Sequence, residues 1–100
     1  MFIWIPVEQS SGVDSKITEM VNAKKWALIN FDDGVVKSLD FYDKREDYSE
    51  WVDFVIIANK FESFIDLMNE GIMVLCVREE ETIDEIMEAF KFKELDEVGL

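Results

Sequence analysis

The chain has 100 residues, enough for one domain around one core, and 49% of them are hydrophobic. Its formal net charge of −13 disfavours nucleic-acid binding, because an acidic surface repels the phosphate backbone. Histidine is absent and Cys76 is the single cysteine, which excludes Ser-His and Cys-His nucleophile pairs and an intrachain disulfide. We therefore expect one cytoplasmic domain over 1–100, with no signal peptide and no membrane span.

The first half of the chain predicts three strands and little helix. Phe2–Val7 is almost continuously apolar, as in a strand buried on both faces. A weak helical stripe follows over 17–21, which Asp14 or Ser15 could cap.

A β-hairpin is predicted next. Lys25–Phe31 and Val35–Tyr42 flank Asp32-Asp33-Gly34, and Asp-Gly between two strand-like runs tolerates the positive φ that a tight turn needs. The second strand mixes polar and apolar residues, which suits an edge strand with one wet face. A short turn of helix is expected over Tyr48–Val52.

The second half predicts two interior strands, Phe54–Ala58 and Ile72–Val77, and a helix after each of them. Apolar residues recur at helical spacing over 61–68 and again over 83–90. Gly71 stands where the first of these helices would end. Two capping boxes would open the helices: Asn59 with Glu62, and Thr82 with Glu85.

These elements predict an α/β domain of three layers, with helices on both faces of a mixed five-stranded sheet in the order 3-2-1-4-5. The hairpin would form the one antiparallel pair, and crossover helices would make the other pairs parallel. Strands 1 and 4 would then be neighbours at the point where the chain order reverses. Ligands of open α/β sheets lie at the carboxyl ends of such strands, so the loops 8–15 and 58–62 are the expected site.

Several pieces of the sequence resemble the dinitrogenase iron–molybdenum cofactor biosynthesis family, of the NifX and NifB C-terminal type. The most specific are Ile5-Pro6-Val7, then Gly12-Val13-Asp14-Ser15-Lys16-Ile17 and Glu19. Thr82-Ile83-Asp84-Glu85 also fits the opening of the last helix of that family. The resemblance implies the nitrogenase accessory factor-like fold, which has a ribonuclease H-like motif, over nearly the whole chain.

The same resemblance implies a non-enzymatic protein that binds or carries the iron–molybdenum cofactor or an iron–sulfur precursor. The ligand contacts would come from both loops; the candidates are Gly12, Asp14, Ser15, Glu19, Asn59 and Lys60. Two motifs depart from the family. Met20-Val21-Asn22 replaces His-Phe-Gly, and Asn59-Lys60-Phe61-Glu62 replaces a glycine-rich Gly-Gly-x-Gly loop. The alternative is therefore a protein-interaction module that kept the fold and lost the ligand, and no metal ligands are assigned.

Simpler structural roles compete with the functional ones. Met20 is more often a core residue than a ligand, Cys76 is expected to be a buried hydrophobe, and Asp14 and Ser15 could serve only as a helix cap. Two enzymatic alternatives fail. A ribonuclease H-type nuclease needs carboxylates on its core strands, which Phe2–Val7 lacks, and a phosphoacceptor receiver domain needs an acidic cluster and a lysine that are missing here.

Overall fold

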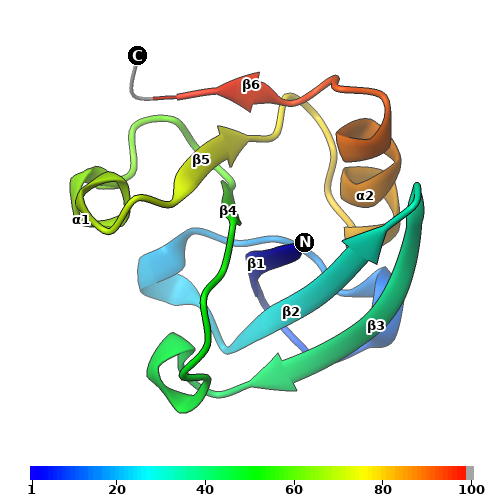
Figure 1. Ribbon diagram of the computed structural model, residues 1–100, viewed down its shortest axis with the longest axis horizontal. Coiled ribbons are helices and arrows are strands. Elements are labelled where there is room, and N and C mark those ends of the chain that lie inside the picture. The colour runs from blue at the N-terminus through cyan, green and yellow to red at the C-terminus, as the bar shows by residue number, and fades with distance from the viewer. Residues whose placement is uncertain (99–100) are drawn as a thin grey trace.

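The computed structural model describes residues 1–98, and they form a mixed sheet with one α-helix on each face (Figure 1). The strands lie in the order β3-β2-β1-β4-β5-β6. Their bounds are Phe2–Val7 (β1), Lys25–Asp32 (β2), Val35–Tyr42 (β3), Phe54–Ile57 (β4), Met73–Cys76 (β5) and Asp96–Glu97 (β6). The helices are Ile65–Asn69 (α1) and Ile83–Lys91 (α2). No helix in the described part is long and apolar enough to cross a membrane.

The α/β class and the placement of helices on both faces are confirmed, but the strand count of five is wrong. The two-residue strand β6 extends the sheet beyond β5 and pairs with it antiparallel. Nothing in its sequence, Asp96-Glu97, has the apolar pattern of a strand. It forms because the chain after α2 returns along the free edge of β5, where backbone groups need partners.

The prediction of a single antiparallel pair is also wrong. β1 pairs antiparallel with β2, as β2 does with β3, and only β1–β4 and β4–β5 are parallel among the described pairs. The reason is that the helix predicted over 17–21 does not form, so no crossover carries the chain from β1 to β2. Ile17 instead bridges Val7, and its amide donates to the Glu81 carbonyl at 2.8 Å. Short 3-10 turns, Gly12–Asp14 and Met20–Asn22, flank this extended stretch.

Two local turn signals are confirmed by the structure, and a third is displaced along the chain. The predicted hairpin forms, with Asp33 at φ 52° and Gly34 at φ 77°, as a two-residue turn with both φ positive requires. The capping box at Thr82 and Glu85 is also confirmed. The helical turn predicted over Tyr48–Val52 lies earlier, as a 3-10 turn at Arg45–Asp47.

The sheet separates two apolar clusters. On the α2 face, Ile3, Ile5 and Ile29 pack with Ile83 and Ile86, all fully buried. On the α1 face, Trp4, Trp26 and Val55 pack with Leu67, and Trp4 also meets the rings of Tyr42 and Tyr48 edge-on. Cys76 is buried in this second cluster and Met20 packs against it, as predicted. The α1 face is the less completely covered one, since its helix has only five residues.

Candidate functional site

The carboxyl ends of β1 and β4 lie side by side, as the predicted switch point requires, because these two strands pair in parallel. Two segments leave this edge. The chain after β1 passes through the turns Gly12–Asp14 and Met20–Asn22, and the chain after β4 forms the loop that leads into α1. The site was predicted at loops 8–15 and 58–62, and the contacts of each loop show how this edge is built.

The loop after β1 is held against the start of α2. Ser15 is fully buried; its hydroxyl accepts from the Ser11 amide and donates to the Gly12 carbonyl, both at 2.7 Å. The Ser15 carbonyl then accepts from the Ile83 amide at 3.0 Å. Ser15 therefore fastens this loop to α2 rather than capping a helix of its own, whereas the Asp14 and Glu19 side chains are exposed. Gly12 is exposed too, and its φ of 61° is the conformation that glycine adopts most easily.

The loop after β4 is organised around the carboxylate of Glu62. One oxygen accepts from the Met20 amide at 2.7 Å, and the other accepts from the Ala58 and Asn59 amides at 3.1 and 3.0 Å. The Asn59 side chain accepts from the Phe61 amide at 2.8 Å, while the Asn59 and Lys60 side chains are exposed. Three backbone donors converging on one carboxylate form a cradle for a negative group, and in this chain Glu62 fills it.

Glu62 also explains why the helix predicted over 61–68 begins only at Ile65. One half of the expected capping box forms, since the Glu62 carboxylate accepts from the Asn59 amide, but the Asn59 side chain accepts from Phe61 and no helix begins there. Phe61, expected on the buried stripe, is 84% exposed. Glu62 also accepts from the distant Met20 amide, and the chain remains a loop until α1 begins at Ile65. The same bond joins the Met20 turn of the first segment to the loop after β4.

The residues at this edge do not fit a metal cluster. Within the described residues, no group of three Cys, Asp or Glu side chains is placed to hold a metal ion, and the sequence has no histidine. Burial raises the pKa of the Cys76 thiol, and the nearby Asp96 carboxylate raises it further, so the thiolate that a cluster needs is disfavoured. The thiol donates instead to the Val77 carbonyl at 3.3 Å.

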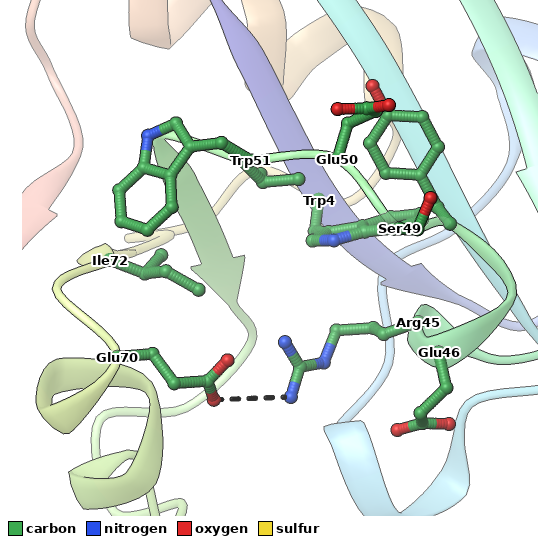
Figure 2. Close-up of a pocket in the computed structure, with 10 residues that line it drawn as sticks. Trp4, Arg45, Glu46, Ser49, Glu50, Trp51, Glu70 and Ile72 are labelled. Carbon is green, nitrogen blue, oxygen red and sulfur yellow. Dashed lines mark ion pairs between the residues drawn. The ribbon is translucent and has the colours of Figure 1, made fainter.

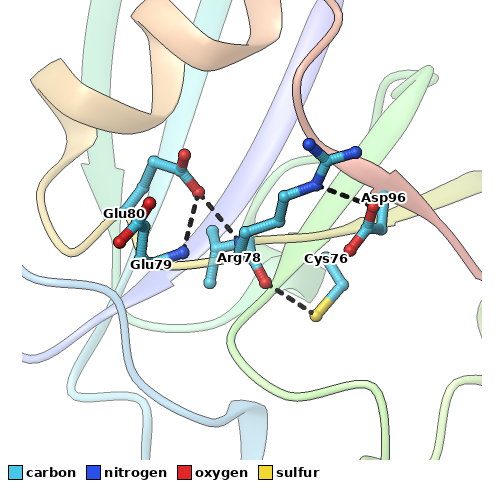
Figure 3. A network of polar contacts seen from close by, with 6 residues as sticks. Cys76, Arg78, Glu79, Glu80 and Asp96 are labelled. Atoms are coloured by element: carbon cyan, nitrogen blue, oxygen red, sulfur yellow. Dashed lines mark hydrogen bonds and ion pairs between the residues drawn. The ribbon is translucent and has the colours of Figure 1, made fainter.

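The end of β5 belongs to the same edge and is closed by polar contacts (Figure 3). Arg78 Nε donates to Asp96 at 2.9 Å, which joins the turn after β5 to β6. A Glu80 carboxylate oxygen accepts from the backbone amides of Arg78 and Glu79 at 2.9 and 3.3 Å. As with Glu62, a carboxylate of the chain itself satisfies the free amides of a loop.

A different kind of surface lies beside α1 (Figure 2). A hollow of about 380 Å³ is bounded by Trp4, Trp51 and Ile72, with Glu46, Glu50 and Glu70 around it. Arg45 pairs with Glu70 at 3.9 Å and lies over the Trp26 ring at 5.5 Å. A second hollow, of about 540 Å³, continues on the other side of Arg45, between Val21 and Asp66.

The sequence did not predict the three amide contacts of Glu62, nor the exposed residues around the two hollows. The replacement of the family's glycines predicts a loop filled by side chains, but the sequence indicates Glu62 only as a helix-capping residue and not as the acceptor of three amides. Trp51 and Arg45 were not singled out at all. The available signal was a tryptophan directly after a strongly charged segment, 43–50, and before the apolar strand that begins at Phe54.

Comparison with known proteins supports the fold and not a specific activity. No protein-family model and no curated protein matches the sequence. Among solved structures, a "putative dinitrogenase" of Methanocaldococcus jannaschii superposes with a TM-score of 0.72 at 21% identity, covering 99% of this chain and 95% of the other. An NMR structure of that protein gives 0.74 at 23% identity, with 100% and 94% covered.

A third similar structure is a "putative NifB protein" from Thermotoga, assigned to the DUF35 family. It has a TM-score of 0.69 and 18% identity, and the match covers 96% of this chain and 91% of that one. The chain therefore has the fold of these proteins. The resemblance seen in the sequence extends to the three-dimensional structure.

Proposed function

We propose that this chain is a non-enzymatic protein-interaction module that keeps the nitrogenase accessory-like fold and binds a partner protein through the α1 side of its sheet. The observation that carries the proposal is the exposure of large apolar residues around the two hollows. Trp51, which lines the first hollow, is 58% exposed, and Val21, which lines the second, is 91% exposed. Exposed apolar side chains grouped in this way, rimmed by polar residues, are typical of protein-binding surfaces.

The composition of this surface supports the same conclusion. Tryptophan and arginine are enriched among the residues that contribute most to binding energy in protein interfaces. Trp51 lies over Gly71, where its ring carbon is 3.4 Å from the position that a glycine Cβ would occupy, so the ring rests on the backbone beside α1. The ring is therefore positioned before a partner arrives, which lowers the entropy lost on binding.

The charges around the hollows indicate the chemistry of the partner. Glu46, Glu50 and Glu70 line the first hollow, where Arg45 pairs with Glu70 and a net negative charge remains. Asp43 and Asp66 line the second hollow together with Lys44, and Asp43 is paired with Lys25. The complementary occupant is a segment of another protein that carries lysine or arginine beside apolar side chains.

The filled cradle at Glu62 supports an interaction role over a cofactor role. A bulky anionic ligand at the switch point would need the amides that Glu62 already engages, and would also have to approach its negative charge. The absence of the family's histidine and of its glycine-rich loop also disfavours cofactor binding. The fold is then retained as a scaffold for the α1 surface.

The proposal is tested by selecting displayed peptides on the folded chain and measuring the affinity of the enriched sequences. We expect basic peptides with apolar or aromatic residues, and at least a tenfold loss of affinity for Trp51→Ala. Phe92→Ala is the matched control, since Phe92 is equally exposed, at 59%, but lines neither hollow. Enrichment of acidic peptides, or equal losses in both variants, would show that the α1 surface is not the binding site.

A second candidate, a carrier of an iron–molybdenum or iron–sulfur cluster, is favoured by the description of the similar structures as dinitrogenase- and NifB-like. In that case the Glu62 carboxylate would have to leave its three amides when the cluster binds. Glu62→Gly would then strengthen cluster binding, whereas an interaction module would show no saturable cluster binding before or after the change.

A further inference from the structure

At the opposite edge of the sheet, where β4 and β5 begin, lies a cavity of about 470 Å³. Its apolar lining includes Phe31 from the end of β2, Phe54, Met73 and Leu75 from β4 and β5, and Phe90 and Leu95 from α2 and the segment after it. The volume falls in the range of small-molecule sites, roughly 300–1,000 Å³. This cavity shares no residue with the hollows beside α1 and lies on the α2 face.

Three aromatic rings form a preorganised wall of the cavity. Phe90 meets Phe31 and Phe54 edge-on, with ring centroids 5.3 and 5.2 Å apart and interplanar angles of 83° in both pairs. Each ring comes from a different element, so the wall is held by β2, β4 and α2 together. All three rings are only partly buried, which leaves apolar ring surface available to a ligand.

The charge of this cavity is opposite to that of the rest of the protein. Lys91 and Lys93 line it, with Glu97 as the one acidic residue of the lining. The chain as a whole carries 23 acidic residues against 10 basic ones. Within the described residues, the ion pairs engage other cations, namely Lys25, Arg45 and Arg78. Lys91 and Lys93 take part in none of these ion pairs, although the Lys91 ammonium lies over the Phe92 ring at 5.6 Å.

Lys93 supplies a second, independent observation. It has φ 59°, in the left-handed region that glycine normally occupies after a helix. The backbone there follows the usual helix-ending pattern, since the Lys93 amide donates to Phe90 and the Glu94 amide to Ala89. A glycine would fit this position with less strain. At this position the lysine places an amino group beside the apolar cavity at the cost of some backbone strain.

We propose that this cavity binds a small monocarboxylate with an apolar alkyl or aryl body. The phenylalanine and leucine side chains cover the hydrocarbon, and Lys91 and Lys93 pair with the carboxylate at the rim. The Lys91 side chain also lies beside the hairpin turn, 3.7 Å from the position of a Cβ added to Gly34. In Figure 1 the β2–β3 turn and α2 lie next to each other at one side of the molecule.

The test is an NMR titration of isotope-labelled protein with octanoate and 3-phenylpropionate, and in parallel with 1-octanol and octylammonium. We expect saturable shifts from the carboxylates, centred on residues that line the cavity, and weaker binding of the alcohol and the amine. The relative affinities of the two acids show whether the cavity prefers an alkyl or an aryl body. Absence of saturation by either acid, or equal affinity for octanoate and octanol, would overturn the proposal.

Two variants separate binding from folding. Lys93→Gly is expected to raise the melting temperature, since it relieves the positive φ, and yet to weaken carboxylate binding about fivefold through the loss of one partly screened charge. Lys91→Gln should weaken binding similarly. Lys37→Gln is the matched control, because Lys37 is exposed on β3 and does not line the cavity, and its affinity should be unchanged. A Lys93→Gly protein that is more stable and binds octanoate as well as the parent would contradict the assignment.

Discussion

The two faces of the sheet are covered in different ways. On the α2 face, a nine-residue helix with a complete capping box buries Ile83, Ile86, Met87 and Ala89 against the strands. On the α1 face, a five-residue helix buries only Leu67, and the 3-10 turns at Met20–Asn22 and Arg45–Asp47 supply part of the cover. The α2 face is the more completely covered one, whereas the α1 face leaves large apolar side chains exposed and is the one we assign to protein binding.

The largest expected effect contrasts two isoleucines. Ile86→Ala removes a fully buried side chain from the α2 face and should lower the free energy of unfolding by about 2–5 kcal/mol. Ile65→Ala, on the α1 helix, should change it by no more than about 0.5 kcal/mol, because this side chain is largely exposed. Urea denaturation of both variants measures the difference. Similar losses would mean that the α1 face carries as much of the stability as the α2 face.

The next effect concerns the carboxylate that closes the cradle. Glu62→Ala leaves the amides of Met20, Ala58 and Asn59 without this acceptor, and should cost about 1–3 kcal/mol. Glu62→Gln should cost less, since its amide oxygen can still accept. Glu88→Ala, at an exposed position of α2, is the control. If the Glu62 and Glu88 variants lost equal stability, the three hydrogen bonds of Glu62 would not stabilise the fold. The same conclusion would follow if hydrogen exchange of the Met20 amide did not accelerate in Glu62→Ala.

A smaller effect is expected at the start of α2. The Thr82 hydroxyl accepts from the Glu85 amide at 3.2 Å, and Thr82→Ala should lower the free energy of unfolding by about 1 kcal/mol. Thr82→Ser, which keeps the hydroxyl, should lose much less. Urea denaturation of the pair measures the cap. Equal losses for both substitutions would assign the effect to the threonine methyl group and not to the hydrogen bond.

The smallest effect depends on pH. The amides of Glu81 and Thr82 donate to the Glu85 carboxylate and hold its pKa below the ordinary value of 4.5. The folded state therefore binds the proton less readily than the unfolded state, so this contribution is present at neutral pH and is lost as pH falls below about 4.5. The stability difference between the parent and Glu85→Gln should shrink over that range. A difference that grows on acidification would reverse the assigned sign.

The same contrast explains what the sequence could predict. Elements whose partners are near in the chain, such as the hairpin at Asp33-Gly34 and the cap at Thr82, follow local rules and were predicted correctly. Errors came where a distant partner decided the structure. The extended segment at Ile17 depends on Val7 and Glu81, and the late start of α1 depends on the bond from Met20 to Glu62. The strand β6 likewise depends on the free edge of β5.

The candidate site shows the same division. Topology correctly predicted that the carboxyl ends of β1 and β4 would be adjacent, because the order of apolar strands restricts the arrangement of the sheet. Side-chain roles could not be read from order alone. The Ser15 carbonyl accepts from Ile83 at the start of α2, and the Glu62 carboxylate accepts from the Met20 amide, 42 residues away in the sequence. Such contacts exist only after the chain has folded.

The most direct test of the closed cradle is a spectroscopic titration with isolated iron–molybdenum cofactor under anaerobic conditions. The proteins are the parent, Met20→His, a variant with glycine at Asn59, Lys60 and Glu62, and the combination of all four changes. We expect no saturable binding by the parent, little gain from either change alone, and measurable binding by the combination, since a ligand and room for it are then both present. Tight stoichiometric binding by the unmodified chain would contradict the account.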